Sequence, residues 1–125
     1  MPSSHNKTLE MDLKPDIPIF HKTYDLYKTF YEYSVHFPKK DRYTLGQKIE
    51  NNILELLELV VLASQTEGAK KLNTLKSASV KLDVIKILVR LCKELKAIDT
   101  KKYLSLSLLL QEIGKMLGGW IKASS

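Results

Sequence analysis

Cysteine, histidine and long apolar runs are scarce in this sequence of 125 residues, and each scarcity excludes a class of protein. The single cysteine, Cys92, cannot form an intramolecular disulfide, and the three histidines lie too far apart to build a zinc site with it. No apolar run approaches the roughly 18 residues that span a bilayer, and the first residues lack the apolar stretch of a signal peptide. We therefore expect a cytoplasmic protein without a disulfide, a metal site or a membrane segment.

Proline is absent after Pro38, and this absence predicts an all-α protein because nothing beyond that point carries the strongest helix breaker. Hydrophobic periodicity then predicts four helices, at about residues 18–37, 43–67, 70–98 and 101–119. Short connections make sequential helices antiparallel, so we expect an up-and-down four-helix bundle over residues 18–122. Residues 1–17 show no periodicity and are expected to form a flexible N-terminal arm.

Capping residues predict where these helices begin and end. Asp41 is expected to cap the second helix, Gly68 to end it in a left-handed conformation, and Asp99 to cap the fourth helix. The paired Gly118 and Gly119 follow a helix and do not open one after a strand, so they are interpreted as a helix terminator and not as a phosphate-binding loop.

Apolar residues recur at helical spacing, and the first and third helices carry two such stripes each. The second helix has one stripe, formed by Leu45, Ile49, Ile53, Leu56, Val60 and Ala63. The third has one stripe of Leu75, Leu82, Ile85, Val89 and Cys92, and a second of Val84, Leu88, Leu91 and Leu95. The stripe of the fourth is Leu104, Leu108, Ile113 and Leu117. Because a lone bundle needs about one stripe per helix, the surplus predicts a homo-oligomer.

Positive charge is concentrated on the third helix. Lysine and arginine outnumber the acids by 20 to 14, and this net charge of +6 favours anionic partners such as nucleic acid or acidic protein surfaces. At about 100° per residue, four cations share one exposed wedge, with Asp83 as the only acid among them. They are Lys76, Lys86, Arg90 and Lys93. This basic wedge is a candidate nucleic-acid-binding ridge, and an ordinary solvated helix face is the alternative.

Catalytic constellations are missing from the sequence. Cys92 lies on an apolar stripe with no histidine nearby, so we expect a buried structural cysteine and no nucleophile. The Glu-x-x-His pairs of a di-metal bundle do not occur, and His5, His21 and His36 are expected to have surface or capping roles. We therefore expect no enzyme, no catalytic residue, no metal and no cofactor.

Aromatic residues cluster at the start of the chain, since eight of the ten lie between Phe20 and Tyr43. Interleaved with lysines, they have the composition of surfaces that stack the bases of single strands. Their helical spacing is also typical of core packing, which is the favoured interpretation at this point.

Three blocks of the sequence resemble the accessory variability determinant (Avd) proteins of diversity-generating retroelements. They are residues 19–27 (IFHKTYDLY), 37–51 (FPKKDRYTLGQKIEN) and 109–122 (LLQEIGKMLGGWIK). The first two blocks are also similar to the four-helix-bundle proteins encoded in intervening sequences of ribosomal RNA genes. The Gly-Gly-Trp-Ile-Lys ending favours Avd.

The resemblance implies a basic four-helix bundle that assembles as a ring-like homopentamer, binds RNA or DNA, and partners the reverse transcriptase of the same element. It implies no catalysis of its own. In such elements the complex supports mutagenic reverse transcription of a template RNA, which diversifies a target gene. The alternative is a helical scaffold of the intervening-sequence type that has no reverse transcriptase partner.

Overall fold

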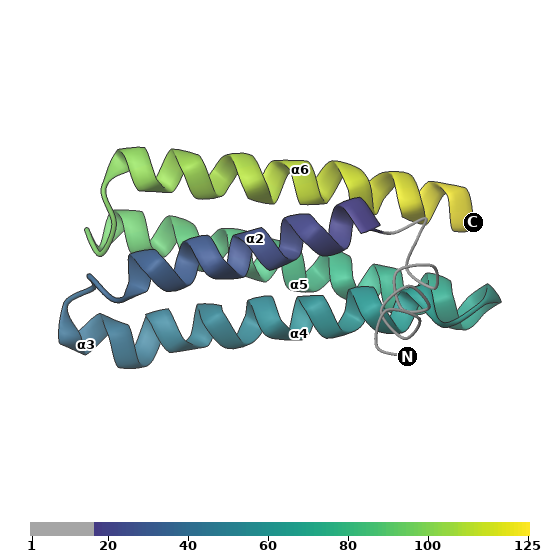
Figure 1. Cartoon of the computed structure of the whole chain (residues 1–125), viewed down its shortest axis with the longest axis horizontal. Coiled ribbons are helices and arrows are strands. Elements are labelled where there is room, and N and C mark those ends of the chain that lie inside the picture. The colour runs from purple at the N-terminus through teal and green to yellow at the C-terminus, as the bar shows by residue number, and fades with distance from the viewer. Residues whose placement is uncertain (1–16) are drawn as a thin grey trace, which may run out of the picture.

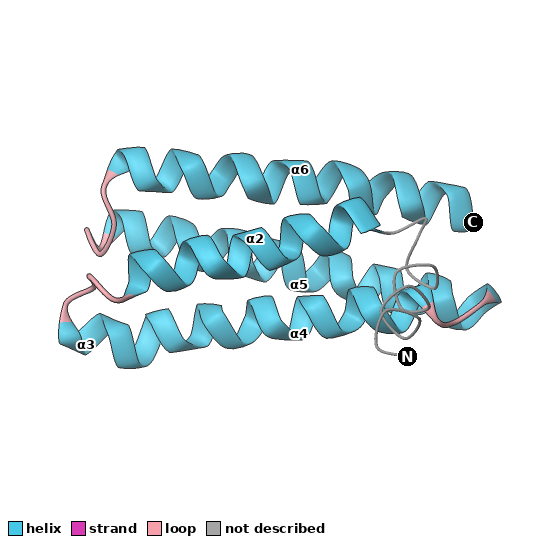
Figure 2. Ribbon diagram, in the orientation of Figure 1, coloured by secondary structure: helices cyan, strands magenta, loops and turns pink. Residues whose placement is uncertain are grey.

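The computed structural model describes residues 17–125, in which four long helices lie side by side (Figure 1). These helices are α2 (Ile17–Ser34), α4 (Gln47–Ser64), α5 (Gly68–Glu94) and α6 (Thr100–Ser124). Loops occur only at the ends of the bundle, so each long helix runs antiparallel to the next (Figure 2). The predicted all-α up-and-down four-helix bundle is confirmed. The expected arm lies outside the described residues, apart from Ile17, which begins α2.

The four helices pack around one core in a square arrangement. Helices α2 and α5 each pack against both α4 and α6, which places α2 and α5 on a diagonal. At the end of α2, the buried rings of Phe30 and Phe37 meet edge to face, with centroids 5.7 Å apart. The stripe predicted for the second helix is buried from Ile49 to Ala63, and Leu45 is half-buried. The first stripe predicted for the third helix is buried throughout.

The apolar stripe predicted for the fourth helix is wrong in its first half. Leu104 and Leu108 are 60% and 59% exposed. The residues of α6 that enter the core are Leu106, Leu110, Ile113 and Leu117. The spacing explains the error. The buried residues of α6 follow one another at steps of four, three and four, which keep them on one face of the helix. The step of five from Leu108 to Ile113 leaves that face.

The connection between α2 and α4 is helical from Lys39 onward, whereas a turn was expected up to Arg42. After Pro38, the short helix α3 (Lys39–Asp41) leads into a π-helical segment, η2 (Arg42–Gly46), and then directly into α4. Asp41 makes no side-chain capping hydrogen bond, so its expected role is wrong. The carbonyl of Pro38 instead accepts hydrogen bonds from the Asp41 and Arg42 amides, each at 2.9 Å. Proline can begin a helix in this way because its missing N–H is not needed there.

The glycines mark different positions from those expected. Gly68 does adopt the left-handed conformation, with φ of 62°, but it begins α5, while α4 has already ended at Ser64. Gly118 and Gly119 do not terminate α6, which continues to Ser124. Beyond them Trp120 and Ile121 pack against the core. This tertiary contact outweighs the low helix propensity of two glycines. The predicted cap at Asp99 is confirmed, because its carboxylate accepts from the Lys102 amide at 2.8 Å.

Candidate nucleic-acid interface

The basic wedge lies on the solvent side of α5. Lys76, Lys86, Arg90 and Lys93 are all exposed, because the opposite face of the helix supplies the core stripe from Leu75 to Cys92. Their positions along α5 place four cations within one quadrant of the helix surface. A ridge of this kind can contact successive phosphates without reading sequence.

Glu94 shares this quadrant. The expectation that Asp83 is the only acid within the basic wedge is therefore wrong. The Arg90 Nε lies 3.2 Å from the Glu94 Oε2, one helical turn away. Both side chains are largely exposed, at 72% and 58%. An exposed pair of this type contributes little stability and exchanges readily for a stronger anion. Arg90 therefore stays available for a phosphate.

Two wedge residues face the neighbouring helix α6. The Lys93 Nζ lies 4.8 Å from the centre of the Tyr103 ring, a cation–π contact that directs this lysine toward α6. Lys86 lines a groove of about 370 Å³ between α5 and α6, and Gly114 and Lys115 lie on its other wall. The small glycine leaves room there, since a Cβ at Gly114 would sit 3.5 Å from the Lys86 Nζ.

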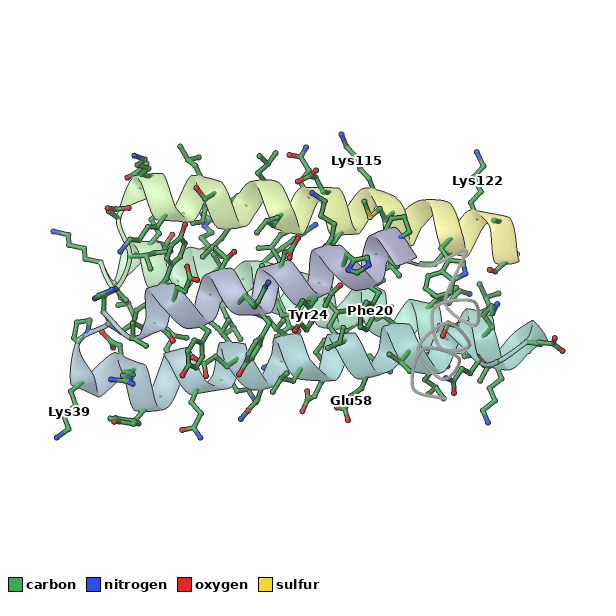
Figure 3. All side chains as sticks on the ribbon, viewed as in Figure 1. Phe20, Tyr24, Lys39, Glu58, Lys115 and Lys122 are labelled. Carbon is green, nitrogen blue, oxygen red and sulfur yellow. The ribbon has the colours of Figure 1, made fainter. Side chains whose placement is uncertain are left out.

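Lys115 and Lys122 extend the cationic surface onto α6, and sequence reasoning missed them. Both project from α6 into solvent in Figure 3. Lys115 lies across the groove from Lys86, a juxtaposition that depends on how α5 and α6 pair. No spacing within one helix could have revealed it.

The acidic residues of α4 lie away from this surface. Glu58 projects from α4 on the side of the bundle opposite Lys115 (Figure 3). Glu55 binds Lys81 of α5 at 2.6 Å, and this hydrogen bond holds the pKa of the Glu55 carboxyl below its usual value. Glu58 and the paired Glu55 therefore lie outside the basic wedge, whereas Asp83 of α5 lines the groove beside Lys86.

Cys92 is buried, as predicted, and burial raises the pKa of its thiol to about 12. A thiol that stays protonated at neutral pH is a poor nucleophile. Among residues 17–125, no three His, Cys, Asp or Glu side chains are grouped so that they could hold a metal ion. His21 and His36 are exposed, while His5 lies outside the described residues. None of the helices in this part of the chain is long and apolar enough to cross a membrane.

The aromatic cluster serves the core only in part, so the favoured interpretation of core packing is wrong for three tyrosines. Tyr24, Tyr31 and Tyr43 are 48%, 53% and 60% exposed. In Figure 3 Phe20 and Tyr24 lie together on α2, and their rings stack with centroids 6.2 Å apart. The exposed tyrosines are thus a second surface with the composition of a nucleic-acid contact.

Comparison with curated proteins and with solved structures finds no match. A family model described as bAvd-like matches residues 18–124, which include all four long helices except Ile17, the first residue of α2. The match extends over most of the 125 residues, including each of the three sequence blocks that resemble Avd. The chain therefore belongs to the bAvd-like family of Avd-type proteins.

Proposed function

We propose that this protein is a non-catalytic accessory subunit that binds nucleic acid in the cytoplasm and partners the reverse transcriptase of a diversity-generating retroelement. In that role it would support mutagenic reverse transcription of a template RNA. Membership of the bAvd-like family supports the association with such an element. The binding role has separate physical support in the charge of the molecule.

The exposed basic wedge is the observation that carries the binding role. Four cations of α5 and the facing Lys115 of α6 line one side of the bundle, with the groove between the two helices running among them. Lysines act as point charges, whereas only arginine offers a planar fork to a phosphate. A surface built mostly from lysine therefore favours contact with the phosphate backbone over recognition of a particular sequence.

Self-association would multiply these contacts. The exposed apolar residues of α5 lie beside the basic wedge and include Val80, Val84, Ile87 and Leu91. We call this set the α5 apolar stripe. If it joins subunits into a ring-like homopentamer, as the Avd resemblance implies, each ring carries five copies of the basic wedge. Weak phosphate contacts then add by multivalency.

Reversing two wedge charges tests the binding role. We expect the double variant Lys86→Glu, Arg90→Glu to lose binding to RNA and DNA, while wild type binds with an affinity that falls linearly on a log–log plot against salt. Fluorescence anisotropy with labelled oligonucleotides measures the affinity of the variant and the salt dependence of wild type. Lys48→Glu, Lys70→Glu is the matched control, because it reverses two exposed lysines outside the basic wedge.

Circular dichroism and light scattering establish that each variant keeps its helicity and size. Equal binding by the wedge variant and wild type would reject the wedge as the interface, and Lys39, Lys40 and Arg42 would be the next basic face to test. A wild type that binds no nucleic acid near physiological salt would favour the scaffold alternative.

A further inference from the structure

Three exposed tyrosines have no role in the core or in the basic wedge. Tyr31 stacks on the half-buried Tyr27, with ring centroids 6.2 Å apart and planes 28° from parallel. Tyr43 stands on η2 and is 60% exposed. A large aromatic ring held at the surface by a rigid helix is a preformed stacking platform.

Tyr31 and Tyr43 line a single pocket of about 220 Å³. Three elements build it: Tyr31 comes from α2, which Val35 directly follows, Arg42 and Tyr43 come from η2, and Gln47 and Glu50 from the start of α4. Its lining combines aromatic faces, a cation, an amide and a carboxylate. This is the mixture of apolar walls and a few polar groups that a small-ligand site uses.

The π-helical segment η2 positions Arg42 and Tyr43 at this pocket. Its last residue, Gly46, is buried, and a Cβ there would lie 3.4 Å from both the Asp41 carbonyl oxygen and the Phe37 ring. The Thr44 hydroxyl donates to the Lys40 carbonyl at 2.8 Å. Segments of π-helix are rare and occur often at functional sites. Here the segment presents Arg42 and Tyr43 beside α2.

Glu50 is held in a fixed position at the pocket. The hydroxyl of the buried Ser34 donates to the Glu50 Oε2 at 2.5 Å. A carboxylate has a second oxygen, which can accept from an exocyclic amine of a base. The neighbouring Gln47 amide can both donate and accept. These two groups supply hydrogen bonds to a base edge, while the tyrosine rings supply the stacking surface.

We propose that this pocket between α2, η2 and α4 binds an unpaired nucleobase of a single-stranded RNA or DNA, with Tyr31 and Tyr43 stacking on the base and Arg42 contacting its phosphate. The inference deepens the proposed function, on which it rests for the class of ligand. A duplex keeps its bases stacked inside, so the pocket selects single strands. Lys39 and Lys40 are exposed on the adjoining helix α3 and can guide the strand.

The pocket stays accessible in the proposed oligomer. It lies between α2 and α4, whereas the α5 apolar stripe belongs to the helix that is diagonal to α2. Figure 1 shows α2 in front of the more distant α5. Subunits can therefore join through α5 while each one keeps its pocket open.

Paired tyrosine variants test the pocket. We expect Tyr31→Ala, Tyr43→Ala to weaken binding to a labelled single-stranded 12-mer by about 10-fold, since the variant removes both rings on which a base can stack. Binding to the matched duplex should not change. The conservative variant Tyr31→Phe, Tyr43→Phe keeps both rings and should bind the single strand as wild type does. Lys86→Glu, Arg90→Glu should instead weaken single strand and duplex alike.

Unchanged single-strand binding by the alanine variant overturns the pocket and would assign Tyr31 and Tyr43 to a protein contact. An equal loss for the duplex also overturns it, because the tyrosines would then contact nucleic acid without stacking on an unpaired base. If wild type binds neither oligonucleotide, the proposed binding role fails, and mononucleotides decide the pocket separately. Shifts of the Tyr31 and Tyr43 ring signals in NMR spectra on adding nucleoside monophosphates would retain it. Unmoved signals would reject it as well.

Discussion

Lys96 ends α5 in a backbone conformation that is unfavourable for lysine. Its φ is 63°, and the helix closes with a hydrogen bond of 2.8 Å from the Ala97 amide to the Cys92 carbonyl, spanning five residues. The Lys96 amide adds a second bond of 3.0 Å to the Lys93 carbonyl. This is the Schellman arrangement, in which glycine is usual because it lacks the Cβ that crowds a left-handed backbone.

We expect Lys96→Gly to raise the free energy of unfolding by about 1 kcal/mol, because it relieves the left-handed strain of a side-chain-bearing residue. Lys96→Ala is the control, since it removes the same charge but keeps the Cβ. Urea denaturation followed by circular dichroism measures both. An equal stability change in the two variants would show that charge, and not backbone conformation, is responsible.

At the scale of whole elements, the sequence predicts helices better than their ends. The single stripe of α4 is unambiguous because every step from Ile49 to Ala63 keeps the helical period. In α6 the dense run of leucines fits two registers, and only packing against α5 and α2 selects the one with Leu106 and Leu110 inside. The π-helical segment brings the buried Gly46 close to the Phe37 ring, and no hydrophobic period in the sequence indicates this approach.

Glycines within these elements give opposite predictions. Gly119 lies inside α6, and a Cβ there would meet nothing within 4 Å. Gly119→Ala should therefore stabilise the protein by about 0.5–1 kcal/mol, through helix propensity alone. Gly68→Ala should destabilise it by about 1 kcal/mol, although the space around it is also open, because its φ of 62° disfavours a side chain. Thermal unfolding of both variants measures the contrast, and a shift of the same sign in both would refute it.

For the whole molecule, charge and apolar surface could be assigned to helices from the sequence, but their combination across helices could not. The four wedge cations follow from the spacing within α5 alone. The position of Lys115 at the same groove, and of Tyr31 and Tyr43 at one pocket, requires the helices to be packed together. Contacts between elements are long-range in sequence, and residue spacing carries no information about them. The sequence therefore could not predict the candidate pocket, although it did show that the tyrosines lie close together along the chain.

The α5 apolar stripe predicts the size of the protein in solution. Val80 and Ile87 are 64% and 65% exposed, a large loss of favourable burial unless another copy covers them. Light scattering coupled to size exclusion should give several times the chain mass of 14.3 kDa, and five times if the ring is a pentamer. Val80→Glu, Ile87→Glu should yield a helical monomer, because burying two unpaired carboxylates in the interface is strongly unfavourable.

Leu54→Glu, Leu62→Glu is the matched control for charge, since both leucines are exposed on α4, at 40% and 43%. This variant should keep the size of wild type. A monomeric wild type would refute the role of the stripe and the ring together. If the α4 variant dissociates and the α5 variant does not, subunits join through α4 and not through the α5 apolar stripe. Binding of the single-stranded 12-mer to the oligomer would then measure whether the tyrosine pocket is accessible in the assembly. The neutral variant Val80→Gln, Ile87→Gln adds no charge beside the basic wedge and so isolates multivalency, because a lone bundle with an intact basic wedge should bind nucleic acid more weakly than the oligomer and with a shallower dependence on salt.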